Sequence, residues 1–385
     1  SDPKITSDSV VNVLKGQSNT AVNLKIKRKG ENELLDFKIY RQPVSLKSVD
    51  AGFMVYEKTG YIKINRFAKT TFSEFMSFAT DLKSQNVQRI IVDLRNNGGG
   101  YLKEAVDIAD QFLKADTPIL YTKDRSENLS ETFATSDGIF HNEEVIVLIN
   151  EKSASASEIL AGAIQDNDRG TIVGRRSFGK GLVQRIMPLG DGSAVRMTVA
   201  RYYTPTGRSI QRSYSEGRDD YFNDYMSRYA NGELQSADSI DVIDSLAYKT
   251  PKGKTVYGGG GIIPDVFVPK NYDSNHIDLY DMYEAGILER FVFDELEKNR
   301  EFYNDITRDS FESYFEVSES TLLNFQNYLL SFNIQYDKSP EYKSLAKTYL
   351  KATIAQQLFD SNLAYKIIIS QDEMVKKTLE KFAVN

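Results

Sequence analysis

The chain has 385 residues, of which 41% are hydrophobic, so at roughly 150 residues per domain it can form two or three domains with sizeable cores. Its net charge of −6 argues against a general nucleic-acid binder, and no apolar run approaches the roughly 20 residues that span a bilayer. Cysteine is absent and the only histidines, His141 and His276, lie far apart, which disfavours disulfides, thiol nucleophiles, zinc sites and a Ser-His-Asp triad.

The first 42 residues predict one helix and one hairpin. A capping cluster at residues 6–9 precedes an apolar pattern over residues 10–14, which predicts the helix. Residues 22–27 and 35–40 predict the two strands of the hairpin. This is too little sequence to bury a core alone, so we interpret it as half of a small domain.

From residue 43 onwards the sequence predicts alternating strands and helices. The continuous apolar run at residues 89–95 is typical of a strand that is covered on both faces. This alternation predicts an α/β fold with right-handed crossovers. The other predicted elements are strands at 60–67, 118–121 and 145–149 and helices at 71–84 and 102–113.

The pattern changes after Gln184. Residues 185–188 and 193–203 predict two strands joined by a turn. Residues 213–250 are polar with little periodicity, which predicts a long surface excursion. Residues 277–385 are almost wholly helical in pattern, and we interpret them as a separate helical domain or arm.

Residues 151–158 lie between the strand at 145–149 and a helical pattern at 159–166, and they hold three serines: Ser153, Ser155 and Ser157. A strand that turns into a helix at small residues can present a serine at a tight corner, near the free N–H groups of the helix. Composition cannot choose among the three serines. Glu158 is interpreted as a first-turn acid favoured by the helix dipole, with pairing to a base as the alternative.

A serine hydroxyl is a weak nucleophile unless a base takes its proton, and Lys180 is the candidate base. Its neighbours Phe178, Leu182 and Val183 are apolar, and burial would lower the pKa of the lysine. Gln184 lies four residues on, so in a strand it shares a face with Lys180 and can orient the amine without charging it. The alternative is a solvated lysine on a surface hairpin.

Acyl transfer also needs donors for an oxyanion, and two sources stand out. One is the backbone N–H of Ala156, and the other is the glycine triplet at residues 98–100. A phosphate-binding loop is the alternative for the triplet, but neither GxGxxG nor GxxxxGK[ST] is present. The four glycines at 258–261 fail the same test, and we interpret them as a close-packed strand entry.

Four ordered motifs together, at residues 93–100, 153–158, 177–184 and 258–265, resemble those of the C-terminal processing peptidases, or tail-specific proteases. The resemblance implies an α/β fold with a crotonase/ClpP-like protease core and a β subdomain over residues 43–275. It also implies a Ser-Lys serine peptidase that uses no metal and no cofactor.

The resemblance further implies a role for each site residue. Ser155 is the expected nucleophile, Lys180 the general base and Gln184 its assisting residue, and the backbone of Gly100 and Ala156 is the expected oxyanion hole. The expected activity is a serine endopeptidase that cleaves proteins near apolar C-termini through an acyl-enzyme. The alternative is a catalytically silent binding module on the same core. Such a module need not keep Ser155, Lys180 and Gln184 together. A tricorn-related protease is a third possibility, but it would need a histidine at a suitable motif.

The flanking regions are also assigned by resemblance. Residues 1–42 resemble the second half of a PDZ domain whose first half is missing, so we expect a processed or truncated start. Residues 276–385 form the expected helical C-terminal domain, with contacts to an adaptor or to a second copy of the chain. The expected partners are protein or peptide substrates with apolar C-termini, without nucleic acid, in the periplasm or cell envelope.

Overall fold

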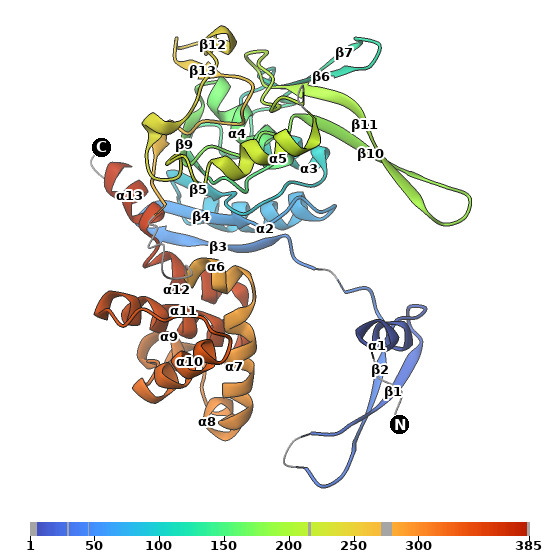
Figure 1. Cartoon of the computed structure of the whole chain (residues 1–385), viewed down its shortest axis with the longest axis vertical. Helices are drawn as coiled ribbons and strands as arrows, with labels where there is room; N and C mark the ends of the chain where they lie inside the picture. The colour runs from blue at the N-terminus through green and yellow to red at the C-terminus, as the bar shows by residue number, and fades with distance from the viewer. Residues whose placement is uncertain (1–5, 29–30, 45, 215–216, 271–278, 383–385) are drawn as a thin grey trace. The chain divides into compact units, whose positions relative to one another are not determined.

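The computed structural model describes residues 6–28, 31–44, 46–214, 217–270 and 279–382. The chain divides into two compact units, Ser1–Lys47 and Ser48–Asn385 (Figure 1). The domain boundary predicted after residue 42 stays a prediction, and the one predicted between residues 275 and 276 lies outside the described residues. The second unit includes the helical region together with the sheets.

The first unit contains one helix and one hairpin, as predicted. Helix α1 spans Ser7–Leu14, and strands β1 (Ala21–Ile26) and β2 (Leu35–Tyr40) pair in antiparallel fashion. The Arg41 side chain donates from Nε to the carbonyl of Leu14 at 2.7 Å, which ties the end of the helix to the end of the hairpin. The likeness of this unit to half of a PDZ domain stays a prediction.

The centre of the second unit is a six-stranded sheet with the order β14-β9-β8-β5-β4-β3. Strands β4, β5, β8, β9 and β14 run parallel, and β3 is antiparallel to β4, so the predicted α/β fold is confirmed. The strands span Val49–Tyr56 (β3), Thr59–Ile64 (β4), Arg89–Asp93 (β5), Glu144–Ile149 (β8), Gly170–Gly174 (β9) and Val266–Phe267 (β14). Sequence patterns did not predict β3 and β9, which are interrupted or bounded by glycine.

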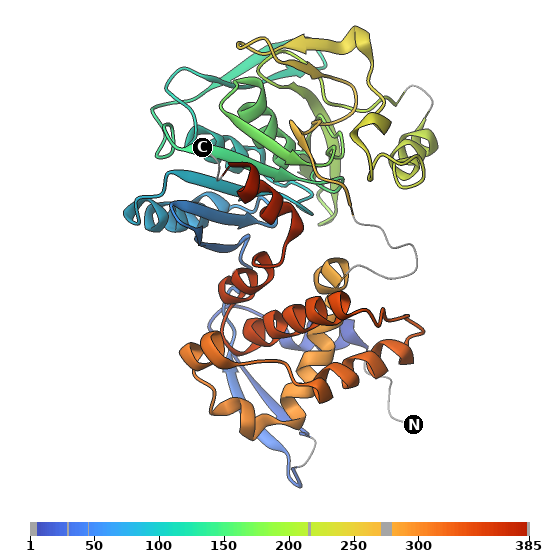
Figure 2. The same cartoon turned by 90° about the vertical axis from the view of Figure 1, so that its left-hand side faces the viewer.

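Both faces of this sheet are covered. Helices α2 (Thr71–Ser84), α3 (Leu102–Asp110) and α4 (Ala156–Asp166) share one buried cluster with the side chains of Ile90 and Val92. Ile91 points to the opposite face, where it packs in a second cluster with Met374 and Val375 of α13 (Glu373–Phe382) (Figure 2). The apolar run in β5 is thus explained, because successive residues of a strand point to opposite faces and both are buried.

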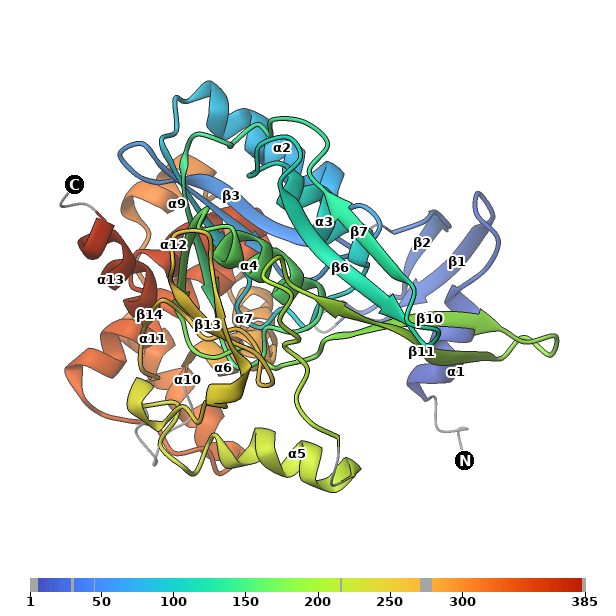
Figure 3. The ribbon, with the colours of Figure 1, turned by 90° about the horizontal axis from the view of Figure 1, so that it is seen from above.

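A second sheet has the order β10-β11-β6-β7 and is antiparallel throughout. Its strands span Pro118–Asp124 (β6), Leu129–Phe133 (β7), Leu182–Pro188 (β10) and Ala194–Tyr203 (β11). Strand β10 lies at the edge of this sheet, and the β10–β11 hairpin projects from the body of the unit (Figure 3). The two predicted strands after Gln184 are confirmed, whereas β7 was not predicted.

The segment 213–250 is more than a surface excursion, which corrects the prediction. It contains helix α5 (Arg218–Ser227), the 3-10 turns η1 (Ala237–Ser239) and η2 (Asp244–Leu246), and β12 (Ala247–Lys249), which pairs with β13 (Thr255–Tyr257). The segment is polar in sequence, yet it contributes buried residues: Arg228 and Glu233 are 0% and 2% exposed. A buried cluster that is built from charged side chains leaves no apolar pattern in the sequence.

The helical pattern of the last hundred residues is confirmed, but these helices do not stand apart from the sheet. Ala51 and Phe53 of β3 belong to the apolar cluster of the helical region. None of the helices among the described residues has the length and apolar character needed to cross a bilayer. The remaining helices are α6 (Leu279–Glu284), α7 (Ile287–Lys298), α8 (Arg300–Asn304), α9 (Arg308–Tyr314), α10 (Glu319–Ser331), α11 (Pro340–Leu358) and α12 (Ser361–Ile369).

Candidate active site

Ser155 stands at the corner where the connection from β8 enters helix α4. Its backbone has φ 56° and ψ −112°, a conformation that non-glycine residues rarely adopt. The serine is half-buried, and its hydroxyl donates no hydrogen bond to any residue that the structure describes. The predicted strand-to-helix corner therefore exists, and the hydroxyl at its apex is free to donate a proton.

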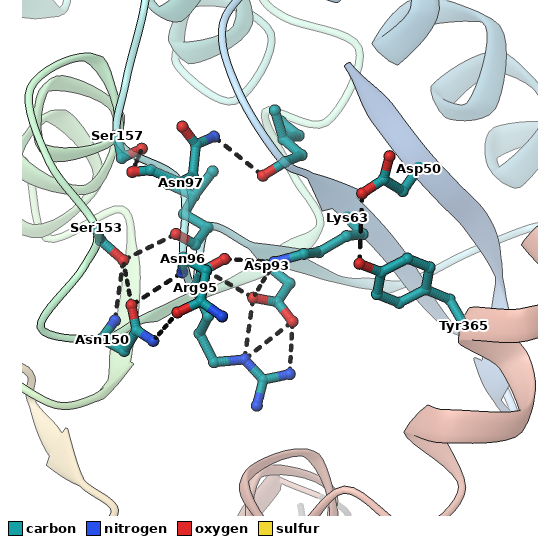
Figure 4. A network of polar contacts seen from close by, with 12 residues as sticks. Asp50, Lys63, Asp93, Arg95, Asn96, Asn97, Asn150, Ser153, Ser157 and Tyr365 are labelled. Atoms are coloured by element: carbon teal, nitrogen blue, oxygen red, sulfur yellow. Dashed lines mark hydrogen bonds and ion pairs between the residues drawn. The ribbon is translucent and has the colours of Figure 1, made fainter. Parts of the chain in front are cut away.

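The two flanking serines have a different role. Ser153 and Ser157 are both fully buried, and each donates a hydrogen bond to a main-chain carbonyl of the segment after β5. The Ser153 hydroxyl lies 2.8 Å from the carbonyl oxygen of Leu94, and the Ser157 hydroxyl lies 2.9 Å from that of Asn97 (Figure 4). The structure thus separates three serines that composition could not, because Ser153 and Ser157 donate to main-chain carbonyls whereas the Ser155 hydroxyl donates to no described acceptor.

The glycine triplet lies directly against this corner. A Cβ atom on Gly99 would come within 2.8 Å of Cβ of Ser155 and 3.0 Å of the nitrogen of Ala156, and one on Gly100 within 2.0 Å of the carbonyl oxygen of Phe67. Both glycines also have positive φ, at 97° and 149°. The N–H groups of Gly100 and Ala156 donate to no described acceptor, so both are available to a ligand.

The Lys180 side chain contacts Gln184, as the spacing predicted. Its Nζ donates to Oε1 of Gln184 at 3.3 Å, although a bulge between Val183 and Gln184 breaks the regular register of β10. Burial is the main cause that lowers the pKa of Lys180, and the positive charge of Arg196 on β11 lowers it further. No hydrogen bond joins the amine of Lys180 to the hydroxyl of Ser155 within the described part of the chain.

The carboxylate of Glu158 links two segments. One is the corner at Ser155, here called the serine corner, and the other is the loop at residues 177–181 that carries Lys180, here called the lysine loop. Its Oε2 accepts from the N–H of Ser155 at 2.8 Å and from the N–H of Lys180 at 2.9 Å. Its Oε1 accepts from the hydroxyl of Ser177 at 2.5 Å and from the N–H of Gly179 at 2.6 Å. The side chain is fully buried, and burial raises its pKa despite these four bonds. Glu158 is therefore more than the first-turn acid of the sequence interpretation.

Tyr202 on β11 makes a second link between the same two segments. Its hydroxyl lies 2.7 Å from the carbonyl oxygen of Lys180 and 3.1 Å from that of Ser155. Burial raises the pKa of this phenol well above its usual value, so it remains a donor. Sequence reasoning missed both Tyr202 and Arg196, because nothing in an alternating strand pattern marks which residues face a distant loop.

A buried ionic network of Lys63, Asp93 and Arg95 lies at the start of the loop that carries the glycine triplet (Figure 4). Asp93 accepts from Tyr61 at 2.7 Å and pairs with Arg95 at 2.6 Å and Lys63 at 3.5 Å. Burial alone would raise the pKa of Asp93, but the charges of Arg95 and Lys63 hold it well below its usual range. Arg95 also pairs at 2.8 Å with Asp372, the residue before α13, so the helical region is joined to the loop that carries the triplet.

His141 does not belong to this site. His141 forms hydrogen bonds with Gly138 and Asn142, and His276 lies outside the described residues. Within the described ranges, no cluster of three or more histidine, cysteine or carboxylate side chains could hold a metal ion. The candidate groups for chemistry at this site are the side chains of Ser155, Lys180 and Gln184 and the N–H groups of Gly100 and Ala156.

Comparison with known proteins identifies the central part of the chain. Residues 58–217 match the model of Peptidase family S41, and residues 279–360 match a family of unknown function (DUF8443). A carboxy-terminal-processing protease of Bartonella bacilliformis is 41% identical over 211 residues, which cover 54% of this chain and 48% of that protein. A carboxyl-terminal-processing protease of Synechocystis sp. is 37% identical over 211 residues, covering 54% of this chain and 49% of that protein.

Solved structures include a similar protein as well. The photosystem II D1 C-terminal processing protease is 26% identical, with a TM-score of 0.42, and the match covers 69% of this chain and 60% of that chain. The present chain spans about half the length of the curated relatives that it matches.

Proposed function

The chain carries a peptidase family S41 domain over residues 58–217, and from this premise we propose that it is a serine endopeptidase that cleaves other proteins near their C-termini. In this proposal Ser155 is the nucleophile, Lys180 is the general base and Gln184 orients the amine. The curated relatives, which are named as carboxy-terminal-processing proteases, support the choice of reaction.

One observation carries the proposal: a single oxygen of Glu158 accepts from the N–H of both Ser155 and Lys180. The two nitrogens must therefore lie within about 6 Å of each other. A bridge of this kind keeps the lysine loop beside the serine corner and leaves both side chains free for chemistry. The Tyr202 hydroxyl makes a second bridge, because it lies within hydrogen-bonding distance of the carbonyl oxygens of both Ser155 and Lys180.

The proposed first step is attack by Oγ of Ser155 on the carbonyl carbon of the scissile peptide bond, while the neutral amine of Lys180 takes the hydroxyl proton. The oxyanion that forms is held by the free N–H groups of Gly100 and Ala156. The C–N bond then breaks, the leaving amine takes the proton from Lys180, and an ester remains on Ser155.

In the second step a water molecule gives a proton to Lys180 and attacks the ester carbon. The C–O bond to Ser155 breaks, Oγ regains a proton, and the new C-terminus is released. The lowered pKa of Lys180 supports this role, because a base must be neutral before it can accept a proton.

The proposed substrates are unstructured polypeptides with apolar C-termini, bound as an extended strand. Strand β10, which begins just after Lys180, is the edge of its sheet and can pair with another strand. Its exposed Ile186 and Met187 suit an apolar partner. A place in the periplasm or cell envelope, and contacts of the helical region with an adaptor or a second copy, belong to the same proposal.

The test is cleavage of an unstructured protein with an apolar C-terminus. Ser155→Ala and Lys180→Ala should each lower the cleavage rate by a factor on the order of 1,000 or more, because the nucleophile and its base act as a unit. Ser126→Ala and Lys114→Ala, at exposed positions, are the matched controls and should cleave at the normal rate. Circular dichroism should show an unchanged fold, and cleavage by Ser155→Ala would refute the assignment.

The catalytically silent binding module remains the alternative, and a second measurement separates it from the peptidase. An active chain should form a covalent adduct at Ser155 with a fluorophosphonate probe, visible by peptide mass spectrometry. A wild-type chain that binds the peptide but neither cleaves it nor takes up the probe would favour the binding module.

A further inference from the structure

A cavity of about 320 Å³ lies behind the lysine loop. Its volume is at the lower end of the range of about 300–1,000 Å³ that is usual for small-molecule sites. The four glycines at 258–261, which the proposed function does not use, form one wall. The other walls include Arg176, Arg212, Val242, Ile243 and Ile263.

Two buried arginines, Arg176 and Arg212, line this cavity, and the charge of a third, Arg228, interacts with both. The three guanidinium groups have too few buried carboxylates to match them. Arg176, Arg212 and Arg228 are 8%, 3% and 0% exposed. Glu233 is the buried carboxylate of the group: it pairs with Arg176, and its Oε1 lies 3.9 Å from Nε of Arg228. Asp224, 3.0 Å from Arg212, is half exposed.

The carboxylate of Asp241 also belongs to the cavity wall, but the residue is exposed, so water screens its charge. Burial and the neighbouring charge of Arg176 lower the pKa of Arg228 to about 10, as expected for a cluster with surplus positive charge. The balance of buried groups in the described segments is therefore positive.

The guanidinium group of Arg212 also has unmet hydrogen-bonding capacity. It lies against the rings of Phe178 and Tyr221, with its central carbon 4.4 Å and 4.0 Å from the ring centres. Its Nη1 donates to the carbonyl oxygen of Tyr221, but its Nε and Nη2 are buried and have no hydrogen-bond partner among the described residues. Nε of Arg228 is likewise buried and has no hydrogen-bond partner among the described residues. Buried donors without acceptors are rare in folded proteins, since each costs about 1–3 kcal/mol.

One part of the wall is apolar and consists of Val242, Ile243 and Ile263. Val242 and Ile243 are 41% and 53% exposed, so an apolar ligand group could cover them. Gly260 lets the main chain approach Arg176 closely, because a Cβ atom on Gly260 would come within 2.8 Å of Nη1 of Arg176. We propose that the cavity binds a small organic carboxylate with an apolar body, whose anionic group accepts from Arg212 and whose body covers Val242 and Ile243.

Arg212 and Arg228 are hydrogen-bonded to the lysine loop. The N–H of Arg212 donates to the carbonyl oxygen of Gly179 at 3.1 Å, and Nη1 of Arg228 donates to that of Ser177 at 2.7 Å. A ligand that binds Arg212 would therefore contact a residue that is hydrogen-bonded to Gly179, the neighbour of Lys180 in the chain. The site is distinct from the serine corner, and the inference holds whether or not the chain cleaves proteins.

The test measures binding to the full chain by calorimetry, with two probes that differ only in charge. N-acetyl-leucine should bind, and its neutral analogue N-acetyl-leucinamide should bind at least about 10-fold more weakly, because hydrogen bonds to a charged acceptor are the stronger ones. Equal affinity for the acid and the amide would overturn the proposal. Binding of inorganic phosphate without binding of N-acetyl-leucine would also overturn it, since the apolar body would then have no role.

Variants locate the site. Arg212→Gln removes the donors, and Val242→Trp fills the cavity from an exposed position without altering any guanidinium group. Each should weaken binding of N-acetyl-leucine by about 10-fold or more, whereas the controls Arg290→Gln and Val195→Trp, at exposed positions elsewhere, should not. Unchanged binding to Val242→Trp would overturn the proposal, because it would place the probe elsewhere, such as at the serine corner. These measurements use no protein substrate, so their failure is distinguishable from a failure of the proposed protease activity.

Discussion

Ser155 holds a left-handed backbone conformation, and such strain costs of order 1–3 kcal/mol unless the surroundings enforce it. The surroundings here are explicit: the N–H of Ser155 is bound by Glu158, and its carbonyl oxygen lies within reach of Tyr202. Both partners also hold Lys180 by its main chain. At the scale of single residues, Glu158 and Tyr202 therefore position Ser155 and Lys180 through backbone atoms and do not bind the Ser155 hydroxyl or the Lys180 amine.

Arg196 offers a test of how the lysine is tuned. Its charge lowers the pKa of Lys180, so Arg196→Met should raise that pKa. A general base works when it is neutral, and the rising limb of kcat/KM against pH should therefore move to higher pH in the variant. The shift should shrink at high salt, since Arg196 is exposed.

The control for this experiment is Arg125→Met, an exposed arginine in the turn between β6 and β7. It should leave the pH profile of kcat/KM where it is. A profile of Arg196→Met that coincides with that of the unaltered chain would show that the arginine does not act on the base.

At the scale of elements, the loop after β5 and the corner before α4 form one packed unit. Asn97 accepts through its side chain from the N–H of Gly99 and through its carbonyl from the N–H of Ala154. The same carbonyl accepts from the hydroxyl of Ser157. These hydrogen bonds therefore hold the two loops against each other.

This packing predicts that alanine substitutions at two adjacent glycines change the free energy of unfolding by different amounts. Gly99→Ala should lower the free energy of unfolding by about 2–4 kcal/mol, because the new methyl group meets Ser155 and the residue has positive φ. Gly98→Ala should change it by no more than about 0.5 kcal/mol, because nothing lies within 4 Å of the added atom. Urea unfolding measures both, and equal losses would contradict the packing described for the triplet.

At the scale of the whole second unit, the helical region completes the fold of the sheet. Helix α13 covers the face of β5, β8 and β9 that α2, α3 and α4 leave open, and β3 shares its apolar cluster with the helices. The Arg95–Asp372 pair adds an ionic tie between the two regions. Residues 48–385 should therefore unfold as one cooperative unit.

A core truncation in the helical region tests this cooperativity. Phe325→Ala, at a fully buried position in α10, should cost about 3–5 kcal/mol. It should lower the same transition midpoint that is followed at the sheet by hydrogen exchange of β8. If the helices melted early in the variant while the exchange of β8 stayed unchanged, the helical region would be an independent domain.

Asp50 predicts how the contact between β3 and α12 responds to pH. Burial raises the pKa of this carboxyl from 3.8 to about 6, although the charge of Lys63 and hydrogen bonds from Asn65 and Tyr365 oppose the rise and Glu284 adds to it. The folded chain thus binds more protons than the unfolded chain between about pH 4 and pH 6. The contribution of Asp50 to stability should be greatest below about pH 4 and be lost as the pH rises through 6.

The matching experiment is urea unfolding of Asp50→Asn against pH. The variant should equal the unaltered chain near pH 4 and exceed it by up to about 3 kcal/mol at pH 7, because the neutral amide avoids burying a charge. Asp81→Asn, on the exposed side of α2, should show no such trend. A variant that is less stable at pH 7 than at pH 4, relative to the unaltered chain, would reverse the sign of this argument.

Local patterns in the sequence determined the alternation of strands and helices, the serine-bearing corner, the glycine triplet and the Lys180–Gln184 spacing, because apolar periodicity and backbone freedom act over a few residues. The choice of Ser155 from the sequence depended on resemblance; only the tertiary structure supplies its physical reason, which is that Ser153 and Ser157 are committed to distant carbonyls. The bridge by Glu158, the arginine cavity and the cover by α13 were likewise decided by the fold. Each depends on contacts between residues far apart in the chain, and no local pattern encodes such contacts.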